Sequence, residues 1–152
     1  MTHRAPWECT FAKEEPSRCL PGKRPRTGHE YFEVLSLCIL QAGLSWASVR
    51  SSWPRYRRAF FDFEVAKLAH VAPAALLRRQ GALRNPKKVA ALVANAQEFE
   101  RIREEHGTFG RYLRTVKSDK DACVLLQKRL RHVGPYTAEF YLHCVGRSVY
   151  GS

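Results

Sequence analysis

The sequence of 152 residues lacks the marks of membrane-spanning and secreted chains. No apolar run approaches the roughly 20 residues that a transmembrane helix needs, and the opening MTHRAPWECT has no apolar segment of the kind found in secretory signals. The five cysteines are an odd number at wide spacings without a CxxC pair, which argues against a disulfide framework and a local four-ligand zinc site. We therefore expect a cytoplasmic protein with no membrane partner.

Acidic side chains are scarce. The chain has 14 Asp and Glu against 26 Lys and Arg, which gives a formal net charge of +12. Such a surplus favours binding to a polyanion such as nucleic acid, although it does not bear on the fold. Hydrophobic residues make up 45% of the chain, so most of it is expected to be globular rather than disordered.

Signals for β-strands are also missing. Neither period-two alternation nor an Asn-Gly or Asp-Gly hairpin signal occurs, and there is no repeat of fixed period. Phosphate-binding glycine loops and HExxH zinc motifs are absent as well. Apolar residues recur at helical spacing instead, so the expected fold is all-α, a compact multi-helix domain without a sheet.

The chain is expected to divide into an irregular N-terminal arm, residues 1–30, and a helical domain, residues 31–152. The arm holds four of the eight prolines and the basic cluster KRPR at 23–26. Its six basic and four acidic side chains leave most of the positive charge on the helical domain. Two alternatives stay open for the arm: Trp7 and Phe11 dock it on the core, or it is a free tail.

Proline, glycine and capping residues mark the expected helix boundaries. The clearest helix is 86–106, which opens at Asn85-Pro86 and stops at Gly107. Pro54 is expected to break or restart a helix over 46–62. The other helices are expected at about 31–44 (with Gly43 as its cap), 64–71, 72–81, 109–116, 120–131 and from Pro135 onward.

The segment 128–142 has the layout of a helix-hairpin-helix DNA-binding element, in which two helices flank a sharp glycine turn. Gly134 is expected to let the chain turn without a side chain in the way, and Pro135 presets the second helix. The first N–H groups of that helix then point at an anion. An ordinary connection between two helices is the alternative. The DNA-binding candidates here are Lys128, Arg129, Arg131, Gly134, Tyr136 and Thr137.

Two further segments are candidates for contact with nucleic acid. Lys87 and Lys88 lie in the first turn of helix 86–106, where the helix dipole disfavours cations, so this end is either solvated or faces phosphate. Trp46 follows a capping residue, Ser45, in LQAGLSW. It is either a core residue or the wall of a pocket that stacks a flipped base.

In their order and wording these segments resemble the DNA-3-methyladenine glycosylase I family, a branch of the helix-hairpin-helix glycosylases. The resemblance runs from YFEVLSLCILQAGLSWASV through LRNPKKVAALVANAQEF and FGRYLRTV to LRHVGPYTAEFYLHCVG, about residues 31–148. It implies a helical fold with a cleft and a monofunctional glycosylase that hydrolyses the N-glycosidic bond of alkylated purines in base excision repair. It also implies a monomer without a cofactor, acting on double-stranded DNA with a flipped base.

The chain departs from the family where the base is read. Cys38 stands where family members usually carry a glutamate that reads the edge of the alkylated adenine. Gln41 lies one turn further on roughly the same face, so the resemblance makes Cys38, Gln41 and Trp46 the candidates for the catalytic pocket. The family's N-terminal tyrosine-histidine-tryptophan stretch is not found in residues 1–30. Its zinc ligands beyond the last helix have no counterpart either, so no structural metal is expected.

The remaining charged residues limit the possible chemistry. Glu33 matches another glutamate position of the family and is expected either to anchor the N-terminal turn or to act in catalysis. The sequence has no aspartate after Asp121 and no lysine after Lys128, which disfavours a Schiff-base lyase on the usual plan. Two hypotheses stay open: a glycosylase of the 3-methyladenine type, or a non-catalytic helix-hairpin-helix DNA-binding relative with a degenerate base pocket.

Overall fold

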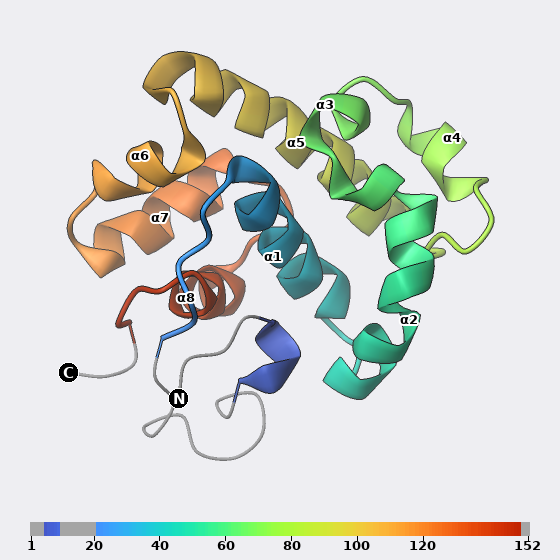
Figure 1. Ribbon diagram of the computed structural model, residues 1–152, viewed down its shortest axis with the longest axis horizontal. Helices are drawn as coiled ribbons and strands as arrows, with labels where there is room; N and C mark the ends of the chain where they lie inside the picture. Colours follow the sequence, from blue (N-terminus) through green and yellow to red (C-terminus); the bar gives the residue numbers. More distant parts are fainter. Residues whose placement is uncertain (1–4, 10–20, 150–152) are drawn as a thin grey trace.

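The computed structural model describes residues 5–9 and 21–149 and is built from helices (Figure 1). No strand occurs among these residues, so the prediction of an all-α fold is confirmed. The α-helices are α1 (Gly28–Gln41), α2 (Trp46–Ala59), α3 (Val65–Leu68), α4 (Pro73–Leu77), α5 (Pro86–His106), α6 (Phe109–Arg114), α7 (Asp119–Arg129) and α8 (Pro135–Cys144). Two 3-10 helices, η1 (Pro6–Glu8) and η3 (Phe61–Phe63), accompany them. Across the described ranges, no helix has both the length and the apolar character that crossing a membrane requires.

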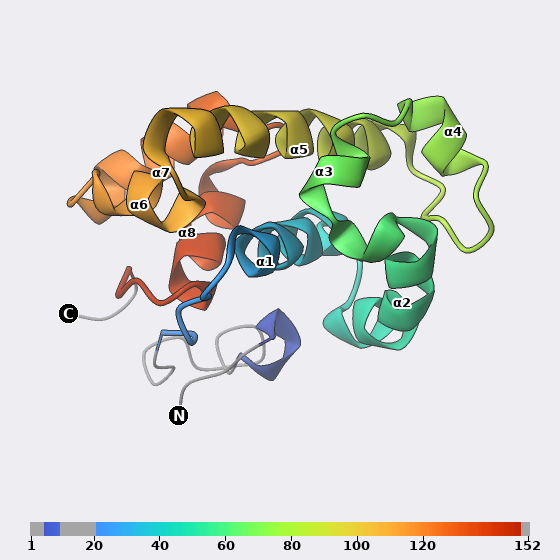
Figure 2. The same ribbon diagram turned by 45° about the horizontal axis from the view of Figure 1, so that its top comes forward.

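Helix α1 is the buried centre of the fold. Nine of its 14 residues are buried, as expected for a helix that neighbours cover on most sides. The 21-residue helix α5 packs against it, with the rings of Phe32 and Phe99 edge to face at 5.1 Å. Helices α2, α3 and α4 lie at one end of α5, and α6, α7 and α8 lie at the other (Figure 2).

Local capping decides where the helices begin and end. Helix α1 begins at Gly28 rather than at residue 31, because the Thr27 hydroxyl accepts a hydrogen bond from the Glu30 N–H at 3.2 Å. It ends before Gly43, whose φ of 84° is left-handed, in agreement with the expected glycine cap. Helix α5 occupies the predicted range and is capped by the Asn85 side chain. The helices expected at 64–71 and 72–81 shrink to about one turn each, α3 and α4.

The prediction that Pro54 breaks α2 is wrong, because the helix continues through this residue. The buried residues Val49, Trp53 and Tyr56 fall three or four positions apart on one face of α2. Tertiary packing of such a face supplies most of a helix's stability in a protein, and here it maintains α2 across the proline.

The described part of the N-terminal arm packs on the helical core. Trp7 of η1 meets Trp53 edge to face, with ring centroids 6.3 Å apart. The Cys9 Sγ lies 3.2 Å from Nε2 of His143 in α8, and the Gly22 N–H donates to the His143 carbonyl at 2.7 Å. Docking is therefore confirmed for Trp7, whereas Phe11 lies outside the described residues.

Gly22 brings the arm very close to the end of α8. A Cβ atom at Gly22 would overlap the backbone carbonyl of Cys144, whereas a Cβ atom at Gly28 would meet nothing within 4 Å. The obstacle at Gly22 is backbone, so rotation of a side chain cannot relieve it. The arm is thus fitted to α8 at a position where only glycine has room.

We expect Gly22→Ala to lower the free energy of unfolding by about 1–3 kcal/mol, because the added methyl group forces two backbone segments apart. Gly28→Ala is the matched control and should leave stability within about 0.5 kcal/mol of the parent or slightly raise it. Denaturant unfolding of the purified proteins measures both values. Equal stability of the two variants would contradict the close packing of the arm on α8.

Candidate functional site

The predicted hairpin joins α7 to α8 through residues 130–134. Its sharp point is His132, with a left-handed φ of 62°, whereas Gly134 has an extended backbone with φ −90° and ψ −177°. The expectation that Gly134 makes the turn is therefore wrong, because any residue adopts that extended backbone. A Cβ atom on Gly134 would meet nothing within 4 Å, so no packing within the protein requires a glycine at this position.

Helix α8 begins on the open side of this hairpin. Gly134 is its N-cap and makes no side-chain cap, and Pro135 is its first residue. An α-helix leaves its first N–H groups without intrahelical partners and concentrates positive partial charge there, which suits an anion. Gly134 and Pro135 are exposed, and Tyr136 is 59% exposed, so the start of α8 is accessible to a phosphate group.

A depression of about 530 Å³ lies beside the hairpin turn. Its walls come from two parts of the chain far apart in sequence. Ala42, just past the end of α1, forms one side, and residues 130–134 with Gln127 and Thr137 form the other. The structure thus brings together the QAGLSW segment and the hairpin, which the sequence suggested as separate candidates.

An aromatic series runs from the QAGLSW segment to the surface of α8. The ring of Trp46 lies 5.7 Å from that of Phe140, and the ring of Tyr136 is nearly parallel to Phe140 at 6.2 Å. Ser45 fixes the start of α2 by accepting a hydrogen bond from the Ser48 N–H at 3.1 Å. Trp46 is only partly buried, so it is packed against the core and also reaches the surface.

Cys38 and Gln41 behave differently from one another. Cys38 is a buried free thiol, 3% exposed, and together with Cys9 and Cys144 it contributes to a raised pKa of Tyr136, to which burial contributes most. Gln41 is partly exposed, and its Nε2 donates to the Leu44 carbonyl at 2.8 Å. The Gln41 amide therefore closes the turn after α1, and a pocket shared by Cys38 and Gln41 remains a prediction.

Lys88 is buried, contrary to the expectation that it is solvated or faces phosphate. Its ammonium group is 2.9 Å from the Leu40 carbonyl and also donates to the Ala42 carbonyl. Burial lowers the pKa of Lys88. Lys88 therefore satisfies carbonyl groups at the end of α1, where a cation is favourable to the helix dipole. Its neighbour Lys87 is exposed and remains a candidate for phosphate contact.

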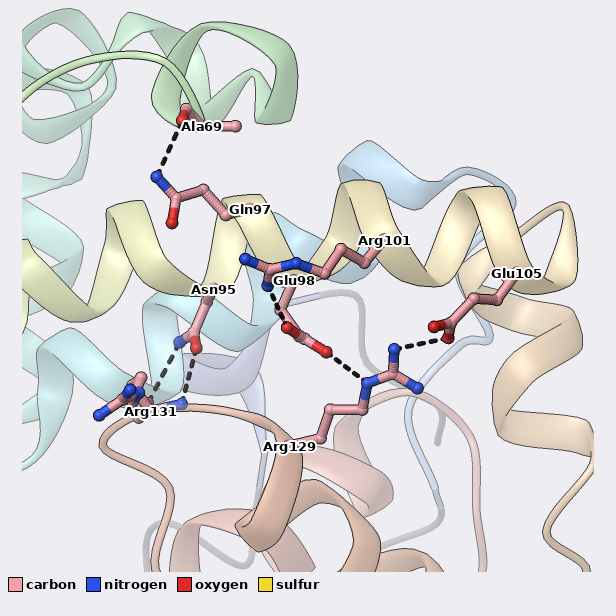
Figure 3. A network of polar contacts seen from close by, with 8 residues as sticks. All are labelled: Ala69, Asn95, Gln97, Glu98, Arg101, Glu105, Arg129 and Arg131. Atoms are coloured by element: carbon pink, nitrogen blue, oxygen red, sulfur yellow. Dashed lines mark hydrogen bonds and ion pairs between the residues drawn. The ribbon is translucent and has the colours of Figure 1, made fainter.

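Arg129 is also occupied within the protein (Figure 3). Its Nε lies 2.5 Å from Glu98 and its terminal nitrogen 2.6 Å from Glu105, so it ties α7 to α5. Burial would raise the pKa of Glu98, but hydrogen bonds from Arg129 and Arg101 outweigh it and lower the pKa. The expectation that Arg129 faces DNA is thus corrected, because its guanidinium already pairs with two carboxylates. Lys128 is exposed and remains a candidate.

Two polar contacts between helices or loops were not predicted. Asn95 is 1% exposed and forms two hydrogen bonds to the backbone of Arg131, whose side chain is exposed (Figure 3). A polar residue on the apolar face of helix 86–106 was the available signal for Asn95. Glu33 accepts from the Trp53 indole at 3.1 Å and lies 3.8 Å from Arg57, so it holds α2 instead of anchoring the N-terminal turn.

The described residues contain no group of three or more His, Cys, Asp and Glu side chains that could hold a metal ion. Cys9 and His143 form a pair of such side chains, with Sγ and Nε2 3.2 Å apart. The chemistry of the site therefore rests on the cationic and aromatic groups around the hairpin.

Comparison with known proteins places these features in a family. Residues 22–137 match the family model of methyladenine glycosylases. The chain is 33% identical over 105 residues to the DNA-3-methyladenine glycosylase of Haemophilus influenzae, covering 65% of this chain and 56% of that protein. It is 32% identical over 79 residues to DNA-3-methyladenine glycosylase 1 of Escherichia coli, covering 50% and 42%. The matched part of the chain thus spans about half the length of these relatives.

Solved structures share the arrangement of the helices. A variant of 3-methyladenine DNA glycosylase I from Staphylococcus aureus superposes with a TM-score of 0.74 at 23% identity, covering 95% of this chain and 94% of that one. A variant solved in complex with 3-methyladenine gives 0.72 at 24% identity, covering 91% and 90%. These likenesses establish the fold, and the family model extends over most of the sequence. The resemblance inferred from the motifs is confirmed: the chain belongs to the methyladenine glycosylase family.

Proposed function

We propose that the protein is a monomeric DNA glycosylase that hydrolyses the N-glycosidic bond of alkylated purines, of the 3-methyladenine type, in base excision repair. The match of residues 22–137 to the methyladenine glycosylase family is the observation that carries the proposal. Two features support it: the depression between Ala42 and the hairpin lies beside a helix start suited to phosphate, and Trp46 of the QAGLSW segment packs on Phe140 of that helix.

The proposed reaction makes modest demands on the protein. In the DNA, 3-alkylated adenine carries a positive charge, so it leaves with the electron pair of the glycosidic bond and needs little acid assistance. Water then adds to the sugar C1′ and loses a proton. The protein's main task is to extrude, stack and orient the base, and Trp46 beside Phe140 is the stacking surface we assign.

The DNA backbone is assigned to the exposed groups around the hairpin. The start of α8, with Gly134, Tyr136 and Thr137, takes one phosphate, and the exposed cations Lys87, Lys128 and Arg131 take neighbouring ones. Such contacts carry little sequence information, so binding should be weakly selective and sensitive to salt. Lys88 and Arg129 are not part of this surface, because both are engaged within the protein.

A second candidate function is non-catalytic DNA binding on the same scaffold. Cys38 favours it, because the family's glutamate is replaced there by a buried thiol. A thiol is a weak hydrogen-bond acceptor and cannot read an adenine amino group as a carboxylate does. The two functions differ in whether a base is released, and a comparison of alkylated with undamaged duplex DNA decides between them.

We expect slow release of 3-methyladenine by the wild type and faster release by Cys38→Glu, increasingly so at higher pH, because burial raises the pKa of a new carboxyl group. Trp46→Ala should slow release in both backgrounds by removing a stacking contact worth roughly 1–3 kcal/mol. Single-turnover assays on methylated DNA measure the four proteins. Val124→Ala, which shortens an exposed side chain on α7 outside this segment, is the control and should match its parent.

The opposite result favours the second candidate. If Cys38→Glu releases no more base than a blank and Trp46→Ala changes nothing, the pocket is not catalytic. Binding of duplex DNA without any release would then identify the protein as a DNA-binding relative.

We expect Gly134→Val to keep its fold and lose about tenfold in affinity for duplex DNA, roughly 1.4 kcal/mol. The extended backbone accepts valine, and no protein atom lies within 4 Å of the new Cβ, so the added bulk meets only the DNA. Fluorescence anisotropy gives the affinity, and thermal melting checks the fold. Unchanged affinity in a folded variant would remove the start of α8 from the interface.

Lys128 and Arg129 are adjacent, but we expect one to act on DNA binding and the other on stability. Lys128→Ala should reduce the slope of log affinity against log salt by about 0.9, the loss of one phosphate contact, at unchanged stability. Arg129→Ala should cost about 1 kcal/mol, or roughly 2–4 °C in Tm, with an unchanged salt slope, because Arg129 joins α7 to α5. Salt titrations and melting curves of both variants test this, and exchanged effects would contradict the assignment.

A further inference from the structure

Two of the buried side chains of helix α5 are polar, whereas its other buried residues are apolar. Lys88 is 5% exposed and Asn95 is 1% exposed. They are separated by seven residues, about two helical turns, and therefore lie on one face of α5. Buried polar groups are costly unless they are hydrogen-bonded, and each of these side chains makes two hydrogen bonds to backbone groups outside α5.

Asn95 holds the peptide groups that lead into the hairpin turn. Its Oδ1 accepts from the Arg131 N–H at 2.7 Å, and its Nδ2 donates to the Arg131 carbonyl at 3.1 Å (Figure 3). The next residue, His132, has the left-handed φ of 62°, an unfavourable conformation for a residue with a side chain. The double hydrogen bond therefore fixes the chain at the position where the turn must be held against strain.

Lys88 holds the other wall of the depression. Its ammonium group donates to the carbonyls of Leu40 and Ala42, on either side of the point where α1 ends. These contacts fix the path of the chain from α1 toward Trp46, and the Gln41 amide closes the turn that follows. A side chain of α5 thus sets the position of residues 42–46, the segment that carries Trp46.

We infer that Lys88 and Asn95 are positioning residues, which use one face of α5 to set the spacing between the base-facing segment 42–46 and the phosphate-facing turn 131–134. Both segments contribute to the depression of about 530 Å³. The inference rests on the proposed function. It adds how the protein sets the distance between the site of the extruded base and the site of the bound phosphate. Neither side chain touches DNA in this arrangement, since both are buried.

The two contacts should have separable effects on catalysis. Asn95→Ala releases the phosphate-facing turn, so it should raise the DNA concentration for half-saturation about tenfold and leave the maximal single-turnover rate of base release unchanged. The salt slope should also be unchanged, because no cation is removed. Lys88→Met keeps an unbranched side chain of nearly the same length but releases the end of α1, so it should lower the maximal rate about tenfold with little effect on half-saturation.

Gln97→Ala is the matched control. Gln97 lies on the same helix and donates its amide to the Ala69 carbonyl at 3.1 Å, at the end of α3 and away from the depression (Figure 3). All variants are assayed on methylated duplex DNA well below their melting temperatures. A merely structural role would lower Tm and leave both kinetic constants of the folded protein at the values of Gln97→Ala. If Asn95→Ala does not fold, Asn95→Ser, which can keep one of the two hydrogen bonds, takes its place.

The outcomes separate the inference from the proposed function. A wild type that binds no duplex DNA overturns both. A wild type that binds DNA and releases base, with variants equal to Gln97→Ala, overturns the inference alone. A wild type that binds DNA without releasing base leaves the proposed glycosylase wrong, and the affinity of Asn95→Ala then decides: a tenfold loss supports the positioning role, and no loss overturns it.

Discussion

The packing of α5 against α1 is the contact on which the other parts of the structure depend. Helix α1 is buried along most of its length, and the 21-residue helix α5 packs against it. Apolar contacts such as Phe32 with Phe99 supply the attraction between them, and that attraction has no strong directional preference. The direction comes from polar contacts of α5: Lys88 to the end of α1, Asn95 to the hairpin, and Glu98 to Arg129. One helix thus contributes both to the core and to the placement of the segments that line the depression.

Periodicity and capping residues were sufficient to predict most of the fold. The helix 86–106 was predicted to the residue, because Asn85, Pro86 and Gly107 mark its ends by local chemistry. Local chemistry was insufficient at Pro54, where burial of one face of α2 outweighs the missing hydrogen bond. The position of the arm could not be predicted either, since it depends on contacts with residues more than a hundred positions away.

The site was predicted in outline, and individual residues were assigned less well. Spacing along the chain indicated a hairpin and a tryptophan segment, and the fold brings them together. The spacing did not indicate that Lys88 and Arg129 bind carbonyl and carboxylate groups of other helices, because sequence spacing does not identify partners across the core. Gly134 was assigned for the wrong reason, since its freedom is not used by the backbone and the strain falls on His132.

The contacts of α8 with α1 and with the N-terminal arm have a consequence for how the chain folds during synthesis. The buried face of α1 is covered partly by α8, whose Tyr141 hydroxyl donates to the Tyr31 carbonyl at 2.8 Å across 110 positions. The arm itself is fixed to His143 and the end of α8. Helix α1 therefore leaves the ribosome before α8, and part of its apolar surface stays uncovered until α8 follows. Long-range contacts of this kind slow folding and leave apolar surface exposed in intermediates, which favours aggregation.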